Sequence, residues 1–209
     1  EAVDADVQFW LEEAKSMGFT DVPSSPVQGS QALEEVVAEP VLQFAHAIEP
    51  AGQRYTVGMG AQPAELMFIS VGEATGECFD GQRIVGDAFD LLMAMIEKGL
   101  QRPRHEVFVS WVLHSNSHDQ GMIEDDCLAC LSAQIEWVSP KVVVLLGARA
   151  LQLFRPDLDD LGRYRGQWVE LAGRMALPTF HPEFLLRQPK AKREAWHDLQ
   201  RVMERLGWS

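Results

Sequence analysis

The sequence predicts an α/β protein, a three-layer α/β sandwich whose central sheet is mostly parallel. Three continuous apolar runs occur along the chain, at Leu66–Val71, Val107–Leu113 and Val142–Leu146. Runs of this length suit strands that are covered on both faces. Stretches with helical spacing of apolar residues lie between these runs, which is how parallel strands are joined. With 209 residues, 46% of them hydrophobic, the chain can bury a full core.

The first 60 residues differ in composition from the rest. They contain ten acidic and two basic residues, whereas residues 181–209 contain four acidic and six basic residues. Apolar residues at helical spacing predict an amphipathic helix over Asp6–Met17, and a cluster of Pro and Ser residues over Pro23–Pro26 predicts a turn after it. We therefore expect an acidic, partly helical N-terminal extension over residues 1–60 and an α/β domain over residues 61–209.

The first apolar run ends in the glycine-spaced acidic loop Gly72-Glu73-Ala74-Thr75-Gly76. Glycine lets the backbone turn tightly or approach a ligand closely. Parallel strands place their ligands at their carboxyl ends, so this loop is the first candidate for a functional site.

The remaining elements follow from helical spacing and turn residues. Helices are predicted at Asp87–Lys98, Glu124–Val138 and Lys190–Leu206, and a hairpin-like pair of strands at Trp168–Leu171 and Met175–Leu177. The apolar faces of these helices should cover the sheet.

Composition excludes some classes of protein. No apolar stretch is long enough to cross a membrane, and the amino end does not resemble a signal peptide. Three cysteines are too few for a disulfide framework, so we expect a cytoplasmic protein. The formal net charge of −13 is unfavourable for binding nucleic acid. The extension carries most of that acidity, and it is a candidate surface for a protein partner.

Three ordered motifs resemble a known family. The segment Ala64–Gly76 is similar to A-E-L-M-F-V-G-E-A-P-G, apart from an insertion and Thr75 in place of Pro. Ser139–Gly147 is similar to R-P-K-V-I-V-A-L-G, and His181–Trp196 is similar to H-P-x-x-L-L-R-N-P-x-A-K-R-x-x-W. These are motifs of the uracil-DNA glycosylase superfamily, and the resemblance is closest to its iron-sulfur, thermostable bacterial and archaeal class. It covers about Ala64 to Leu206 and implies a four-stranded, mostly parallel sheet between helices.

The resemblance implies roles for residues in the first and last motifs. Glu73 matches the acidic residue that positions water or stabilises the sugar cation, and His181 matches the histidine that donates a hydrogen bond to the departing base. It also implies DNA as a ligand, contacted by Leu185, Leu186, Arg187, Lys190 and Lys192. Each residue has a plainer alternative as a cap, a buried histidine or a core leucine.

The expected base pocket departs from the family. It would be formed by Gly72, Ala74, Ile84 and Trp111. The family has a Phe in place of Ile84, which stacks on the extruded base, and an Asn in place of Trp111, which reads the edge of uracil. Indole has one donor and no acceptor, so Trp111 cannot reproduce that reading. We expect Trp111 to fill the pocket and ordinary uracil excision to be weak or absent.

The iron-sulfur ligands of the family are mostly missing. Of the four cysteine positions only Cys127 is retained, and one thiolate cannot hold a cluster. We expect no cofactor and no metal. The loop with His114, His118 and Asp119 has metal-binding residue types, but a lone H-x-x-x-H in a polar loop is more often exposed to solvent.

Two functions of different classes remain. One is a divergent, cluster-free glycosylase that excises a damaged base from DNA with weak or altered selectivity. The other is a non-catalytic subunit with the glycosylase fold, which the psi subunit of the bacterial replicase clamp loader exemplifies. Glu73 and His181 favour the first, whereas Ile84, Trp111 and the acidic charge favour the second.

Overall fold

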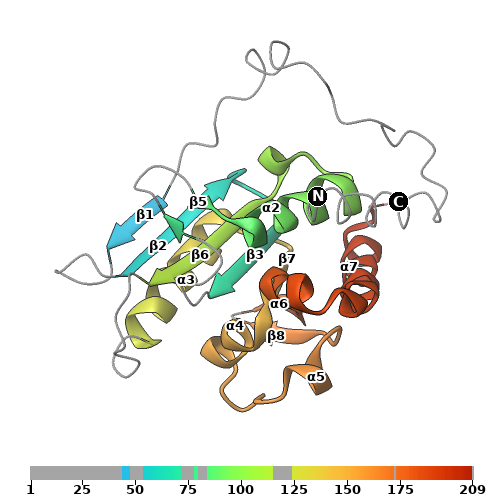
Figure 1. Ribbon diagram of the computed structural model, residues 1–209. Helices are drawn as coiled ribbons and strands as arrows, with labels where there is room; N and C mark the ends of the chain where they lie inside the picture. The colour runs from blue at the N-terminus through green and yellow to red at the C-terminus, as the bar shows by residue number, and fades with distance from the viewer. Residues whose placement is uncertain are drawn as a thin grey trace, which may run out of the picture.

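Figure 1 shows the fold of the chain, a computed structural model. The structure describes residues 44–47, 54–71, 78–79, 84–114, 124–171 and 173–208. The helix expected over Asp6–Met17 and the acidic loop with Gly72, Glu73 and Ala74 lie outside these ranges.

Along the described chain five strands come first, and helices and strands are interspersed after them. The strands are β1 (Phe44–Ala47), β2 (Arg54–Gly60), β3 (Leu66–Val71), β4 (Cys78–Phe79), β5 (Ile84–Val85), β6 (Phe108–His114), β7 (Val142–Leu146), β8 (Val169–Leu171) and β9 (Arg174–Thr179). The α-helices are α2 (Asp87–Ala94), α3 (Glu124–Val138), α4 (Gly147–Phe154), α5 (Leu161–Tyr164), α6 (Pro182–Arg187) and α7 (Lys192–Leu206). A π-helical turn (Met95–Gly99) continues α2, and short 3-10 turns occupy Arg104–Glu106 and Pro189–Ala191.

The main sheet confirms the predicted fold class. Its strand order is β1-β2-β6-β3-β7-β9-β8, and the four central strands, β6, β3, β7 and β9, run parallel. The sheet has seven strands in the described chain rather than four, because an antiparallel strand or pair is added at each edge. A two-residue antiparallel ladder, β4 with β5, forms a separate small sheet.

Two parts of the sheet differ from the expected elements. Strands β1 and β2 come from a weakly patterned segment, and β2 pairs with β6, so the sheet extends across the expected domain boundary at residue 60. The hairpin-like pair is present as β8 and β9, but β9 also pairs in parallel with β7. One strand of the pair is therefore central, and it leads directly to the last motif.

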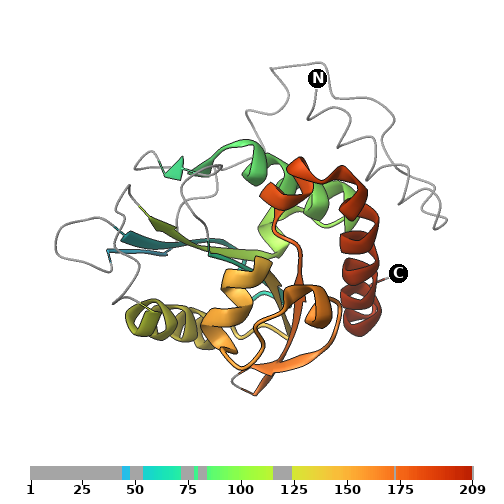
Figure 2. The same ribbon diagram turned by 60° about the horizontal axis from the view of Figure 1, so that its bottom comes forward.

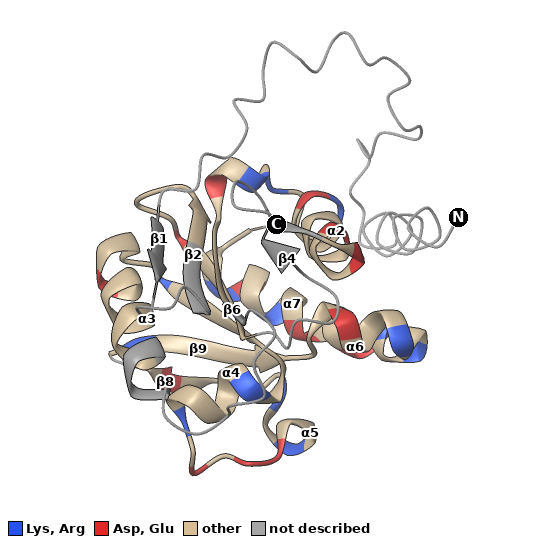
Figure 3. Cartoon of the chain, turned by 60° about the vertical axis from the view of Figure 1, so that its left-hand side comes forward, with Lys and Arg blue, Asp and Glu red and all other residues tan. Residues whose placement is uncertain are grey.

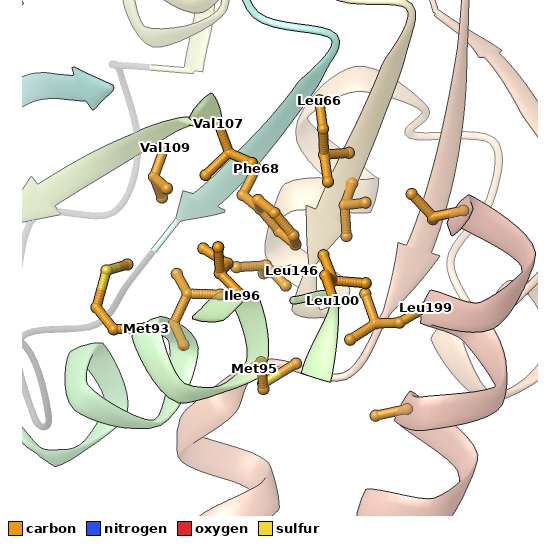
Figure 4. Close-up of a cluster of buried hydrophobic side chains, with 14 of the residues drawn as sticks. Leu66, Phe68, Met93, Met95, Ile96, Leu100, Val107, Val109, Leu146 and Leu199 are labelled. Atoms are coloured by element: carbon orange, nitrogen blue, oxygen red, sulfur yellow. The ribbon is translucent and has the colours of Figure 1, made fainter. Parts of the chain in front are cut away.

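Both faces of the parallel sheet are buried, which explains why its strands are continuous apolar runs. Leu66 and Phe68 of β3 point into a cluster with residues of α2, α6 and α7 (Figure 4). Met67 and Ile69 point to the other side, where they pack against α3 and α4. Figure 2 shows α2, α6 and α7 on one side of the sheet and α3 and α4 on the other. This is the predicted three-layer arrangement.

Helix α7 closes the first of these layers. Trp196, Leu199 and Met203 are buried on one face at helical spacing, and the helix ends at Gly207 with φ 68°. Within the described ranges, no helix has both the length and the apolar character needed to span a membrane.

Candidate active site at the carboxyl edge of the parallel sheet

The order of the parallel strands defines where a site is expected. Along the sheet they occur as β6, β3, β7 and β9, so the chain moves to one side after β3 and to the other side after β6. Ligands in such sheets bind outside the carboxyl ends of the strands where this reversal occurs, between β3 and β7. The residues that end β3 and those that follow β9 approach each other at this edge.

His181 lies at this edge because of where β9 ends. After Thr179 the chain leaves the sheet, and His181 is the N-cap of α6, with Pro182 in the first turn. Its Nδ1 atom accepts a hydrogen bond from the backbone N–H of Glu183 at 3.2 Å. Proline at the first helical position needs no partner for a backbone N–H, so the H-P pair begins this helix efficiently.

The cap determines the tautomer of His181. Because Nδ1 accepts a hydrogen bond, it carries a lone pair, and the proton of the neutral ring is on Nε2. Burial lowers the pKa of His181, and Arg187 lowers it further, while Glu183 acts in the opposite direction. The side chain is therefore a neutral imidazole whose Nε2–H is the donor.

Ser70 accepts the hydrogen bond from this Nε2–H group. Its Oγ lies 2.8 Å from Nε2 of His181, across 111 positions of sequence. Ser70 is fully buried near the end of β3, next to Trp111 of β6 and Leu146 of β7 in the strand register. Sequence analysis did not single it out. The signal was present, since Ser70 is the only polar residue in the run Leu66–Val71.

Gly147 allows His181 to approach the sheet. It begins α4 directly after β7 with φ 86°, a backbone conformation that favours glycine. A Cβ atom at this position would lie 3.0 Å from Cβ of His181. The glycine that ends the strand motif therefore has a specific role: it leaves room for the histidine of the last motif.

Trp111 is completely buried on the same side of the sheet. Its exposed fraction is 0%, and its ring lies 5.7 Å from that of Phe89, at an interplanar angle of 47°. Among the described residues its indole Nε1 has no hydrogen-bond partner. An unsatisfied buried donor costs about 1–3 kcal/mol. Trp111 fills the space beside Ser70 and presents no acceptor there.

The predicted DNA-contacting residues separate into two groups. Leu185 has an exposed fraction of 0% and is part of the core, and Leu186 is half-buried against it. Lys192 is also buried, and burial lowers its pKa. Arg187 and Lys190 are exposed, with Arg187 paired to Glu183. Leu185 and Lys192 are not on the surface, because α6 and α7 need inward-facing residues to pack.

The other predicted site residues are not positioned by the described structure. Gly72, Glu73 and Ala74 lie outside it, and for Ile84 only the backbone of β5 is described. The expected proximity of Glu73 to His181 therefore stays a prediction.

The donor set does not fit the iron-sulfur cluster that the resemblance implies. A cluster needs four thiolates, and the chain has three cysteines, one in β4 and two in α3. Within the described ranges, no three His, Cys, Asp or Glu side chains gather as a metal site would require. His118 and Asp119 fall outside those ranges. The absence of a cluster stays a prediction, and a purified protein without visible iron-sulfur absorption would agree with it.

Fold and site together define an α/β/α sandwich with a neutral histidine at the carboxyl edge of its parallel strands. The chain belongs to the uracil DNA glycosylase superfamily, whose family profile matches residues 57–200. It is 30% identical over 161 residues to the type-4 uracil-DNA glycosylase of Saccharolobus solfataricus, a match covering 71% of this chain and 74% of that protein. It is 33% identical over 138 residues to the Thermotoga maritima enzyme of the same name, covering 63% and 71%. The Archaeoglobus fulgidus enzyme is 29% identical over 190 residues, covering 85% and 94%.

Proposed function

We propose that this protein is a cluster-free, cytoplasmic glycosylase that hydrolyses the N-glycosidic bond of a damaged base in DNA. The observation that carries the proposal is the neutral His181, whose cap places the proton on Nε2 at the edge where the family's motifs meet. The relatives named uracil-DNA glycosylase support DNA as the substrate. The finer part of the proposal is that base selectivity differs from that of the relatives.

The chemistry requires a donor to the departing base. As the bond between the sugar C1′ and the base nitrogen breaks, its electron pair leaves with the base, which becomes anionic. A neutral imidazole N–H can stabilise that charge by a hydrogen bond without transferring its proton. His181 is held in the tautomer that this role requires. Its present partner is Ser70, so a base oxygen would replace or share that hydrogen bond.

Glu73 supplies the second role in this proposal. It follows Ser70 by three residues in the sequence, and Ser70 is hydrogen-bonded to His181. Its carboxylate would stabilise the cationic sugar and orient a water molecule. The water oxygen then bonds to C1′, and the water proton passes to the carboxylate or to solvent.

Trp111 supports altered selectivity. Uracil presents both carbonyl acceptors and a ring N–H donor, and an indole offers one donor only. A site that leaves a buried edge of the base unpaired loses about 1–3 kcal/mol for each missing hydrogen bond. We therefore propose that Gly72, Ala74, Ile84 and Trp111 form a pocket that excludes ordinary uracil recognition.

A non-catalytic function is the second candidate, and one observation favours it. Trp111 is fully buried beside Ser70, and Ser70 already occupies the donor of His181, so the edge where a base would bind is filled. In that case the protein would act as an interaction subunit with a glycosylase fold, and its acidic N-terminal segment would be the surface for a protein partner.

A single-turnover excision assay separates the two candidates. Single- and double-stranded DNA would carry uracil, hypoxanthine, xanthine or an alkylated base, and His181→Ala would be compared with the natural chain. Removing one such donor typically lowers a rate by about 10²–10³-fold. His197→Ala is the matched control, because His197 is exposed on α7. Release that survives His181→Ala would contradict the proposed mechanism, and no release of any base by the folded protein would favour the interaction subunit.

A further inference from the structure

An exposed phenylalanine stands out on the surface of the last motif. Phe184 of α6 is 42% exposed, and among the described residues Trp137 is the other large hydrophobic side chain that is similarly exposed. Of the leucines that follow Phe184, Leu185 is fully buried and Leu186 is half-buried against the core. The most exposed apolar group of this short helix is therefore an aromatic ring and not a leucine.

The ring of Phe184 is held in a stack. It lies 4.8 Å from the ring of Phe180 at an interplanar angle of 29°, which is a stacked geometry. The guanidinium of Arg165 lies 5.1 Å from the Phe180 ring centroid. Arg165 is in turn paired with Glu194 at 3.2 Å and with Asp198 at 3.5 Å. Each member of the stack is thus supported by the next, and Phe184 is its solvent-facing end.

The position of Phe184 is fixed before any ligand arrives. Leu185, its neighbour on the same helix, is fully buried in the core and anchors α6. A rigid aromatic group loses little conformational entropy when a ligand binds, so a ring fixed in this way is suited to recognition. The candidate catalytic residue lies between the two stacked rings in the sequence, since His181 directly follows Phe180 and is the N-cap of α6, the helix that carries Phe184.

The charges around the stack indicate which kind of molecule would cover it. Lys190 and Arg193 are exposed just after α6, and no ion pair joins either of them to another described residue. In Figure 3 the cartoon is coloured blue, for Lys and Arg, over part of the segment where α6 leads into α7. Exposed cations in the same surface segment as an exposed aromatic ring are the combination with which proteins bind single-stranded nucleic acid.

We propose that Phe184 is a stacking platform for an unpaired base of DNA, with Lys190 and Arg193 contacting the adjacent phosphates. This inference rests on the proposed function in taking DNA as the ligand. It differs from the role expected of Leu185 and Leu186, because the group that contacts the base is a flat ring on the surface. The proposal concerns binding and does not require that bond cleavage occurs.

The test is DNA binding by the full chain. A short single-stranded oligonucleotide containing 2-aminopurine reports binding by anisotropy and stacking by quenching of the base fluorescence. Phe184→Ala is expected to weaken binding by about 5- to 150-fold, the range found when a stacking aromatic residue is replaced by alanine. Phe184→Trp should retain both binding and quenching, whereas Phe184→Leu should lose the quenching because a leucine has no flat face.

The chain provides a matched control in Trp137→Ala. Trp137 has the same exposed fraction as Phe184 and lies on α3, in the layer on the opposite side of the sheet. Its replacement should leave DNA binding unchanged. Replacing Lys190 and Arg193 by Gln should reduce the dependence of log affinity on log salt by about 0.7 for each charge removed. Thermal unfolding of each variant would verify that it is folded.

The outcomes separate this inference from the proposed function. Equal binding by the natural chain, Phe184→Ala and Trp137→Ala would overturn the inference, even if base excision is observed. Absence of DNA binding by the natural chain would overturn it as well and would point to a protein ligand for the stack. Weaker binding by Phe184→Ala without any base excision would support the inference and contradict the catalytic proposal.

Discussion

Replacing Gly147 by alanine is expected to destabilise the protein and to displace His181. Gly147 has φ 86°, where a residue with a Cβ atom is strained by about 1–2 kcal/mol. The new Cβ would also lie 3.0 Å from Cβ of His181, so one of the two residues must shift. Overpacking of this kind costs about 1–3 kcal/mol. The two effects together predict a loss of about 2–5 kcal/mol in the free energy of unfolding.

Gly173 provides the control for the backbone strain alone. Its φ is 75°, close to that of Gly147, but nothing lies within 4 Å of the position where its Cβ would be placed. Gly173→Ala should therefore lose only about 1–2 kcal/mol. The difference between the two variants isolates the contact with His181.

Urea unfolding of both variants would measure this difference, and the ring signals of His181 in an NMR spectrum would show whether the histidine moves. We expect those signals to shift in Gly147→Ala and not in Gly173→Ala. Equal losses of stability in the two variants, with unchanged His181 signals, would refute the argument that glycine is required for the histidine to approach the sheet.

Three further predictions follow from the same geometry. Burial lowers the pKa of His181, so its contribution to stability should be full above the pKa of the unfolded chain. As the pH drops through that value toward the folded pKa, the free energy of unfolding should fall by at most about 1.4 kcal/mol per pH unit. Urea unfolding from pH 7 to pH 5 would show a flatter pH dependence in His181→Gln. Thr179→Val removes the hydroxyl that donates to buried Asp198 at 2.7 Å, so it should cost about 1.5–3 kcal/mol near neutral pH. Burial already raises the pKa of Asp198, so that deficit should shrink in acid, where the carboxyl is protonated; a deficit independent of pH would mean that the hydrogen bond is not to a carboxylate. In single-turnover assays on variants shown to be folded, Trp111→Asn alone should restore little uracil excision, and the double variant with Ile84→Phe should restore more. Robust uracil release by the natural chain would show that other residues read the base.

The central strands could be predicted from sequence because their signal is local. A strand buried on both faces must be apolar at every position, so the runs Leu66–Val71 and Val142–Leu146 coincide with β3 and β7. The closing helix α7 was predicted for the same reason, since its inward residues repeat at helical spacing. The antiparallel pair β1 and β2, at one end of the sheet, was missed. Their segment has no strong pattern of its own, and their place is determined by pairing with β6.

The candidate site was only half predictable. The motifs identify His181, but the spacing of residues in the sequence does not predict the direction in which its ring nitrogens point. That direction depends on the cap of α6 and on Ser70, which is 111 residues away and reaches the histidine only because β3 and β9 share one sheet. The requirement for Gly147 has the same origin, a close approach between residues of different motifs.

The sequence alone determined the family, the order in which its motifs occur along the chain, and which histidine is the candidate catalytic residue. Each of these depends on residue types in consecutive positions. Tertiary structure decided which side chains of the last motif face outward. Leu185 and Phe184 are adjacent apolar residues, and their types alone do not distinguish core from surface. The packing of α6 against α2 and the core of that layer buries Leu185. Phe184 lies on the opposite side of this short helix, which faces away from the core, so its ring stays exposed and stacks on Phe180.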